Sequence, residues 1–225
     1  LDGIPNVNGI IEAVRGIIQA ETETSMAVNQ ARRQKEEEQR QKELELRKER
    51  LAKLEPTKVV RTAAAPTIDG EMDEVWKQSD LVPVSKWENS TPDVLGKPLP
   101  DSEFAAAFRT LWDADHFYFY LYVTDNTPNK KPELDWFRND NAVLYIDATD
   151  AKSDSYGPTD YQFIFQWDES APTLTENEHG KMDGVVYKIK NTDKGYCIEA
   201  AFPWATLGTP APGAGTIIGM DVHVS

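Results

Sequence analysis

Residues 104–125 read FAAAFRTLWDADHFYFYLYVTD, and this stretch decides the fold class. Two largely apolar runs flank the triplet Asp113-Ala114-Asp115, which is typical of a turn between two strands. In the second run Phe117, Phe119, Leu121 and Val123 alternate with Tyr118, Tyr120, Tyr122 and Thr124. A period of two predicts a strand with one apolar face turned to a core and one aromatic-polar face.

Further short segments of the same character occupy the rest of the chain. They are VVRTA (59–63), AVLYID (142–147), YQFIFQW (161–167), VVYKIKN (185–191), YCIEAAFPW (196–204) and TIIGMDVHV (216–224). Polar residues, glycine or proline separate them, so the sequence predicts an all-β protein, an antiparallel β-sandwich of the jelly-roll type. Residues 71–78 predict a short helical turn that carries Trp76, and the proline-rich residues 87–102 predict a loop.

The first 55 residues follow a different period. Apolar residues alternate spacings of three and four at Ile4, Val7, Ile11, Val14 and Ile18. This pattern predicts a long N-terminal α-helical extension that buries one stripe against a partner. Residues 32–53 are nearly all strong helix formers, and Pro56 ends the pattern. Two hypotheses remain for residues 1–55: a solvated helical spacer, or a coiled-coil stalk for self-association or partner binding.

Charge and composition exclude several classes of partner. The net charge is −14, and residues 1–55 carry 10 basic and 11 acidic side chains, so the remaining residues carry 14 and 27. Such a negative field disfavours nucleic acid. No apolar run reaches the roughly 18 residues of a transmembrane helix, and we expect no membrane insertion. The single Cys197 excludes an intrachain disulfide, and the start at Leu1 predicts a processed product or a fragment.

The groups that carry catalysis do not converge in the sequence. His116, His179 and His223 lack metal-ligand spacing, and Asp113 and Asp115 are explained by their turn. The phosphate-binding, dinucleotide-binding and nucleophile-elbow motifs are absent from the sequence. We therefore predict a protein that is not an enzyme.

Calcium is the cofactor that the sequence favours. The candidate oxygen ligands are Asp147, Asp150 and Asp154 in DATDAKSD, although a solvated acidic loop explains the same residues. Haem is a further hypothesis, because Met72, Met182 or Met220 could ligate iron together with a histidine. Nothing in the spacing pairs those residues, so no organic cofactor is expected.

The aromatic residues are the richer signal, with six Trp and eight Tyr. Sugar rings stack on aromatic faces, and their hydroxyls bond amide and charged side chains. The core is the better explanation for Trp76, Trp112 and Trp204, which lie in apolar patterns. Trp136 and Trp167 instead have polar neighbours, so these two are either packing residues or surface binding residues.

The order of motifs over about residues 58–225 resembles that of the family 9 carbohydrate-binding modules. The matching pieces are APTIDGEMDEVW (65–76), FRTLWDADHFYFYLYVTD (108–125), W-x3-D-N-A-V-L-Y-I-D (136–147), YQFIF (161–165), GYCIEAAFPWATL (195–207) and IIGMDVHV (217–224). The resemblance implies an antiparallel β-sandwich with structural calcium, usually appended to secreted bacterial xylanases or other surface proteins. It also implies a site in which two tryptophans sandwich the reducing-end sugar.

The residues of that implied site are only partly present. Trp136 matches the first tryptophan, whereas the family's acidic residue corresponds to Ala142 or Val143, with Asn141 the nearest polar substitute. The family's arginine is Ile164, and His223 replaces a glutamine of the last strand. The second tryptophan belongs to a segment beyond Ser225, so we expect the domain to lack its final hairpin.

We predict that residues 58–225 bind a plant-type polysaccharide such as xylan or glucan, or its oligosaccharides. The predicted binding residues are Trp136, Asn139, Asp140, Gln162 and His223, with Trp167 as a second platform. The resemblance places the protein outside the cytoplasm as part of a larger polypeptide, either secreted, periplasmic or on the cell surface. The alternative is a structural or interaction sandwich that has lost sugar binding, with the helix mediating assembly.

Overall fold

A computed structural model describes residues 7–53, 56–84, 100–129, 131 and 135–225. It divides into two compact units, Leu1–Pro56 and Thr57–Ser225, which we describe separately. Most of the predicted loop at 87–102 lies outside the described residues.

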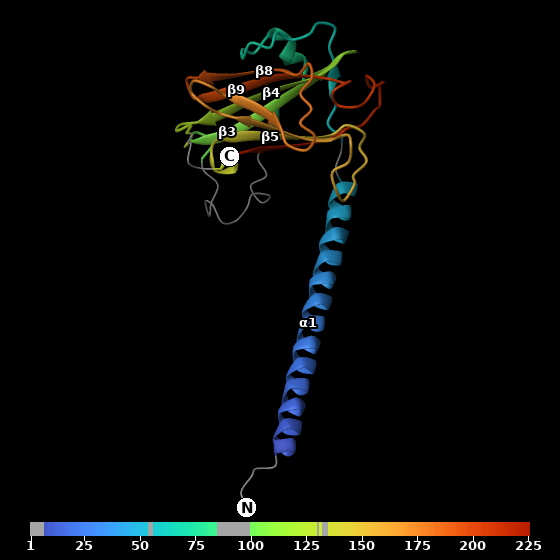
Figure 1. Ribbon diagram of the computed structural model, residues 1–225. Helices are drawn as coiled ribbons and strands as arrows, with labels where there is room; N and C mark the ends of the chain where they lie inside the picture. Colours follow the sequence, from blue (N-terminus) through green and yellow to red (C-terminus); the bar gives the residue numbers. More distant parts are fainter. Residues whose placement is uncertain (1–6, 54–55, 85–99, 130, 132–134) are drawn as a thin grey trace, which may run out of the picture. The chain divides into compact units, whose positions relative to one another are not determined.

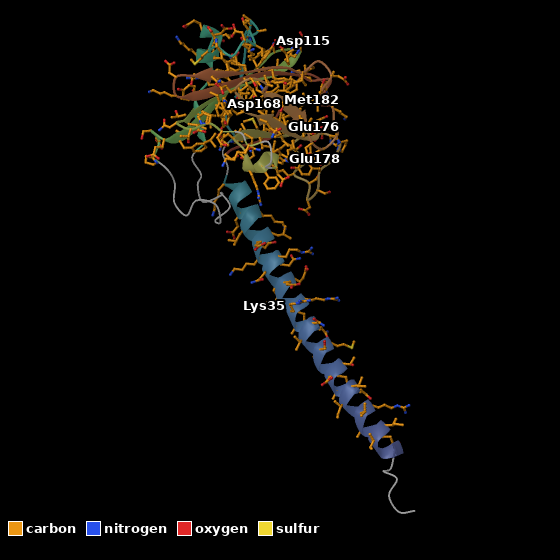
Figure 2. The ribbon with its side chains drawn as sticks, turned by 60° about the vertical axis from the view of Figure 1, so that its left-hand side comes forward. Lys35, Asp115, Asp168, Glu176, Glu178 and Met182 are labelled. Atoms are coloured by element: carbon orange, nitrogen blue, oxygen red, sulfur yellow. The ribbon has the colours of Figure 1, made fainter. Side chains whose placement is uncertain are left out.

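The first unit contains the helix α1 (Val7–Ala52), which confirms the predicted helical extension. Side chains project from it on all sides, with Lys35 as a marked example in Figure 2. Ion pairs one turn apart, such as Arg32 with Glu36 at 3.7 Å, contribute about 0.2–0.5 kcal/mol each to its stability. None of the described helices combines the length and the apolar character needed to cross a membrane.

The second unit contains two β-sheets among its described residues (Figure 1). The first sheet has the order β1-β3-β4-β9-β8, and β2 also pairs with β3. Its strands are β1 (Val60–Arg61), β2 (Val82–Val84), β3 (Phe104–Trp112), β4 (His116–Asp125), β8 (Val186–Thr192) and β9 (Gly195–Pro203). The second sheet has the order β10-β5-β6-β7, with β5 (Asn141–Asp147), β6 (Asp160–Gln166), β7 (Thr173–Glu176) and β10 (Gly219–Val224). All of these pairings except β1 with β3 are antiparallel, which confirms the predicted antiparallel β-sandwich.

The hairpin of β3 and β4 is closed by the predicted aspartate turn. One carboxylate oxygen of Asp113 accepts the backbone N–H groups of Asp115 and His116, both at 2.8 Å. Its other oxygen accepts the hydroxyl of Tyr118 at 2.6 Å. Since these contacts fix the turn, the register from Trp112↔Phe117 onward follows from it.

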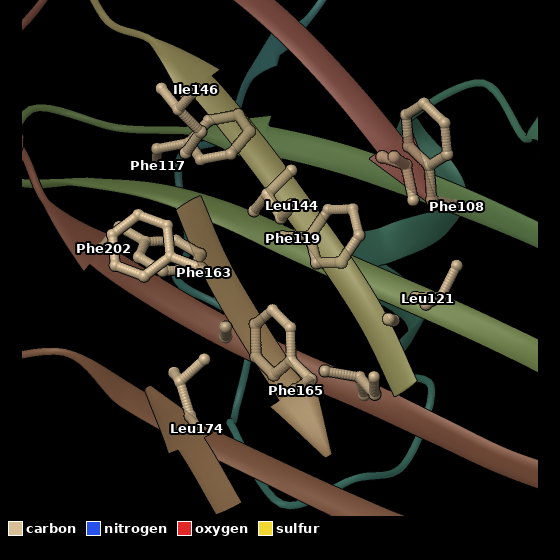
Figure 3. Close-up of a cluster of buried hydrophobic side chains, with 14 of the residues drawn as sticks. Phe108, Phe117, Phe119, Leu121, Leu144, Ile146, Phe163, Phe165, Leu174 and Phe202 are labelled. Atoms are coloured by element: carbon tan, nitrogen blue, oxygen red, sulfur yellow. The ribbon is translucent and has the colours of Figure 1, made fainter. Parts of the chain in front are cut away.

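The core lies between the two sheets and is rich in aromatic residues (Figure 3). The inward-facing residues of β4 meet those of β5, β6 and β9, with Phe163 and Phe202 having ring centroids 4.5 Å apart. Fully burying one such side chain stabilises the fold by about 1.5–3 kcal/mol. Trp76 and Trp204 are buried and Trp112 packs against the core, as predicted.

The outward face of the first sheet is covered as well, because the chain before β2 folds over it. Trp76, on the short 3-10 helix η1 (Glu74–Gln78), is fully buried against Tyr118 and Tyr120. The carboxylate of Glu199 accepts the Trp76 indole N–H at 2.8 Å and the backbone N–H of Gly70 at 2.7 Å. The aromatic-polar face predicted for β4 is thus a second small core.

Candidate functional site

Trp136 begins the 3-10 turn η3 (Trp136–Arg138), which immediately precedes β5. Asn141, the first residue of β5, fastens this turn: its amide donates to the carbonyls of Trp136 at 3.2 Å and Asn139 at 2.7 Å. Ala142 and Leu144 point into the core, so the Asn141 side chain points to the opposite face of the second sheet. The Trp136 turn therefore lies on that opposite side, which we call the outer face.

Two aromatic rings meet at this turn. Trp136 is half-buried, and its ring stands at 90° to the ring of Phe137 with 5.7 Å between centroids. Phe137 is 55% exposed, and the guanidinium of Arg138 lies 5.9 Å from its centroid. The turn consequently presents an aromatic pair and a cation to solvent.

Asn139 and Asp140 are built into the loop that carries the turn. Asn139 is buried, and its amide accepts from the Lys131 N–H at 2.7 Å and donates to the Asp135 carbonyl at 3.2 Å. The carboxylate of Asp140 accepts the N–H of Asn129. Burial, reinforced by the nearby Asp125 carboxylate, raises the pKa of Asp140 to about 6. In this arrangement Asn139 and Asp140, which were predicted to bind sugar, hydrogen-bond the loop and position the Trp136 turn.

The cross-strand row Asp221–Tyr145–Gln162 lies on the outer face, since its members are register partners and Tyr145 has the parity opposite to Leu144. The Gln162 amide donates to the Tyr145 hydroxyl at 3.1 Å. The ring of His223 lies edge-on to Tyr145 with 5.0 Å between centroids. A 3.1 Å contact between its Nε2 and the Asp221 carboxylate raises the pKa of His223.

The next cross-strand row, His223–Val143–Ile164, is apolar at its centre. Val143 is 4% exposed and Ile164 is 3% exposed, although both have outward parity. The middle of this face, between the Trp136 turn and the row of Tyr145, is therefore buried. The family resemblance implies an acid at Ala142 or Val143 and an arginine at Ile164.

Trp167 is placed differently from Trp136. It has the inward parity of Phe163 and Phe165, and it packs partly buried against the core between the sheets. Its indole N–H donates to the Asn191 side chain of β8 at 2.8 Å. Asn191 borders an open hollow of about 500 Å³ that is also lined by Asp69, Asp168, Glu169, Ser170, Pro172, Lys188, Ile189 and Lys190. The structure therefore does not bring Trp167 together with Trp136 on the outer face.

Residues 68–225 match the protein family described as carbohydrate family 9 binding domain-like. The chain belongs to this family. The family 9 domain of this chain is 30% identical over 160 residues to endo-1,4-beta-xylanase A of Thermotoga maritima, covering 71% of the chain and 14% of that protein. It is 27% identical over 161 residues to endo-1,4-beta-xylanase A of Thermoanaerobacterium saccharolyticum, covering 71% and 12%. The chain thus spans only a small part of the curated relatives that it matches.

A solved structure has the same fold. It is a family 9 carbohydrate-binding module from Caldicellulosiruptor kristjanssonii in complex with cellotriose, with a TM-score of 0.59 and 21% sequence identity. The alignment covers 74% of this chain and 76% of that one. The two sheets described above are therefore the architecture of the family.

The three aspartates predicted to bind calcium are not gathered in the family 9 domain. The Asp147 carboxylate accepts backbone N–H groups, including that of Lys152 at 2.9 Å, and these hydrogen bonds lower the pKa of Asp147. Asp150 pairs with the Lys152 ammonium at 3.0 Å, and Asp154 is exposed. Among the described residues, no group of three or more His, Cys, Asp or Glu could hold a metal ion. As arranged, these residues do not fit a calcium site, and calcium binding elsewhere in the chain stays a prediction.

Three residues at this site were missed by the sequence analysis as candidates: Phe137, Tyr145 and Tyr156. Phe137 is adjacent to Trp136, so its exposure follows once the turn is placed on the outer face. Tyr145 lies within the apolar run AVLYID, and only the parity of that strand reveals it as outward-facing. Tyr156, 51% exposed, lies in the loop before β6 and carries no sequence signal of its own.

Proposed function

We propose that the family 9 domain binds carbohydrate on the outer face of its second sheet without catalysing a reaction. The observation that carries this proposal is the aromatic Trp136 turn, which Asn141 fastens beside a row of phenol, amide, imidazole and carboxylate groups. Aromatic rings stack on the C–H faces of sugars, and the polar groups suit their hydroxyls. Polysaccharides of the xylan and glucan type are the proposed ligands, supported by the xylanase relatives and by the cellotriose complex of the solved module.

We further propose that this domain serves a larger, exported polypeptide. The xylanase relatives are several times longer than the matching region, which supports a role as one module among others. A bound module holds its neighbours close to an insoluble substrate and raises their effective concentration there. On this proposal the chain itself supplies attachment, and any hydrolysis belongs to another module.

Isothermal titration with xylo- and cello-oligosaccharides tests the proposed function. Losing one stacking ring costs about 1–1.5 kcal/mol, so Trp136→Ala should weaken binding roughly tenfold. Val186→Ala is a matched control, because Val186 is an exposed apolar side chain on β8 of the other sheet and should bind like the wild type. Absence of heat with every sugar, from a folded wild-type protein, would exclude the proposal.

A second function is favoured by a separate observation on α1. Its side chains include an exposed apolar group at Ile10, Ile11, Val14, Ile17 and Ile18. Such a stripe is typical of a helix that packs against another helix, so we propose self-association through the first unit. Sedimentation at several concentrations tests this: an oligomer formed by the full chain should be lost on deletion of residues 1–55. A full chain that stays monomeric at all concentrations would contradict it.

A further inference from the structure

Two acidic side chains meet where β4 ends, beside the residues that lead into β5. Asp125 is the last residue of β4, in the first sheet, and Asp140 immediately precedes β5, in the second sheet. A hydrogen bond between the two carboxyl groups and the charge of Asp125 both contribute to the raised pKa of Asp140. Two carboxylates in contact repel each other, so the pair needs either a shared proton or a bound cation.

The hydroxyl group of Tyr196 lies beside the same pair. Tyr196 is 1% exposed, and it is the register partner of Val123, two residues before Asp125. Burial raises its pKa, and the charges of Asp140 and Asp125 raise it further, as expected for a phenol close to both carboxylates. This hydroxyl has no hydrogen-bond partner in the part of the chain that the structure describes. Since leaving a buried hydroxyl without a partner is costly, a ligand for it is expected at this place.

Both carboxylates are held in position by the backbone. One oxygen of Asp125 accepts the N–H of Thr127 at 2.8 Å, and one oxygen of Asp140 accepts the N–H of Asn129. The backbone N–H of Asp140 also donates to the carbonyl of Asn129 at 3.3 Å. These hydrogen bonds fix the direction of the two carboxylates, which reduces the entropy lost when they bind a ligand.

The chemistry of this cluster selects a cation. Two carboxylates and a phenol offer only oxygen atoms, the ligands that hard divalent cations such as calcium prefer, and water can complete the coordination. Residues 56–225 carry 27 acidic against 14 basic side chains, a field that attracts cations. The loop of Asp147 differs, because Asp150 there is paired with the Lys152 ammonium.

We propose that Asp125, Asp140 and the hydroxyl of Tyr196 bind one hard divalent cation such as calcium. The three residues belong to the end of β4, the residue before β5, and β9. A cation bound by them joins the first sheet to the entry of the second sheet. The raised pKa of Asp140 describes the protein without this cation.

The position of Asp140 links the cation to the Trp136 turn. Asp140 lies between Asn139 and Asn141, whose side chains accept from or donate to the backbone around that turn. Without the cation the two carboxylates repel each other, so the turn is held less firmly. Sugar affinity should therefore depend on the cation. This link rests on the proposed function, whereas the cation site itself does not.

Calcium titration of the full chain, first freed of metal with EDTA, tests the cation site. Saturating calcium should raise the melting temperature of the wild type by at least about 3 °C. The double variant Asp125→Asn/Asp140→Asn should bind one calcium ion fewer per chain by calorimetry and lose this rise. Asp150→Asn/Asp154→Asn is the matched control and should respond like the wild type. A folded wild type that binds no calcium, or a double variant that binds as much as the wild type, would overturn the inference.

Tyr196→Phe distinguishes a ligand from a residue that only fills space. The variant keeps the ring and removes the hydroxyl, so without calcium it should be at least as stable as the wild type. Its calcium affinity should be about three- to tenfold weaker, because one oxygen ligand is lost. An unchanged calcium affinity would show that the hydroxyl is not a ligand and would overturn its assignment.

Titration with cellohexaose or xylohexaose in calcium and in EDTA tests the link to the Trp136 turn. The wild type should bind sugar at least about threefold more weakly in EDTA, whereas Asp125→Asn/Asp140→Asn should bind it equally in both. Calcium binding without any change in sugar affinity would overturn the link and leave the cation site standing. Absence of sugar binding by the calcium-loaded wild type would overturn the proposed function and the link together.

Discussion

The outward faces of the two sheets of the β-sandwich differ: the chain covers that of the first sheet, whereas that of the second sheet carries exposed polar side chains. On the first sheet the chain folds back over the strands. The carboxylate of buried Glu199 accepts hydrogen bonds from the N–H groups of Asp69, Gly70 and Trp76. On the second sheet the outward side chains form a row that ends in exposed groups such as His223. The segments IDG (68–70) and IEAAFPW (198–204), which belong to two of the motifs that resemble the family, therefore stabilise the fold. The proposed binding residues lie on the other sheet, where the sequence lacks the acid and the arginine that the resemblance implies.

The largest expected effect is a loss of folding stability when the covered face of the first sheet is altered. Glu199→Ala leaves the buried N–H groups of Gly70 and Trp76 and the partly buried N–H of Asp69 without their acceptor. At about 1–3 kcal/mol for each buried donor, unfolding in urea should show a loss of at least about 2 kcal/mol. Glu199→Gln keeps one acceptor oxygen and should lose less. Tyr145→Ala, on the outer face, should cost clearly less than Glu199→Ala. A Glu199→Ala variant as stable as the wild type would contradict the claim that the covered face of the first sheet stabilises the fold.

An intermediate effect on stability is expected from the hydrogen bonds that hold the Trp136 turn on the outer face. Asn141→Ala removes the donors to Trp136 and Asn139, which should lower the stability by about 1–2 kcal/mol and weaken sugar binding as well. Asn141→Asp has a similar shape but donates no N–H, so it should behave like the alanine variant. Differential scanning calorimetry and titration on the same samples measure both effects. Unchanged sugar affinity in a destabilised protein would show that the turn is not the platform.

A smaller effect concerns pH. The pKa of Asp140, raised to about 6 in the folded state, exceeds the value of about 3.9 for an unfolded aspartate. The folded state therefore binds the proton more tightly, and this contribution to stability is present at low pH and lost as the pH rises from about 4 to about 6. Because Asp140 is partly solvated, screening reduces the contribution to about 1 kcal/mol.

Asp140→Asn isolates this contribution. Compared with the wild type by urea unfolding at pH 4.5 and pH 8, the variant should gain relative stability at pH 8, since its amide never pays the cost of a buried charge. The exposed Asp154→Asn is the control and should follow the wild-type profile. A wild-type-like pH profile in Asp140→Asn would contradict the assignment.

The smallest effect concerns calcium. Because Asp147 already accepts backbone N–H groups and Asp150 is paired with Lys152, an Asp150→Asn/Asp154→Asn variant should show the same melting temperature response to calcium and to EDTA as the wild type. A calcium-dependent rise that is present in the wild type and missing in this variant would instead place a cation in the 147–154 loop.

Local periodicity was enough to predict most of the fold. The alternation in β4, the turn at Asp113 and the burial of Trp76 all follow from neighbours in the sequence. The strands β2 and β7 were missed, because β2 contains Pro83 and β7 (TLTE) has one apolar residue, so neither carries a strand signal. Their pairing depends on the strands beside them and not on their own composition.

The candidate site was predictable only in part, because it depends on registers between distant strands. Trp136 was singled out by its polar neighbours, and the structure places its turn on the outer face. Asn139 and Asp140 share those neighbours, yet their side chains bond the backbone of Lys131 and Asn129, contacts that the sequence alone does not reveal. Trp167 has a comparable polar setting but inward parity, which becomes visible only once β6 is aligned with the core.

Mapping the bound sugar onto the backbone tests the central claim most directly. In a ¹H–¹⁵N correlation spectrum, addition of cellohexaose or xylohexaose should shift the amide signals of residues 136–147, 160–166 and 219–224. The signals of residues 186–192 in the first sheet, and of residues 69–76 that cover it, should stay in place. Shifts confined to the first sheet, or to the hollow beside Asn191, would contradict the assignment of the outer face as the binding site.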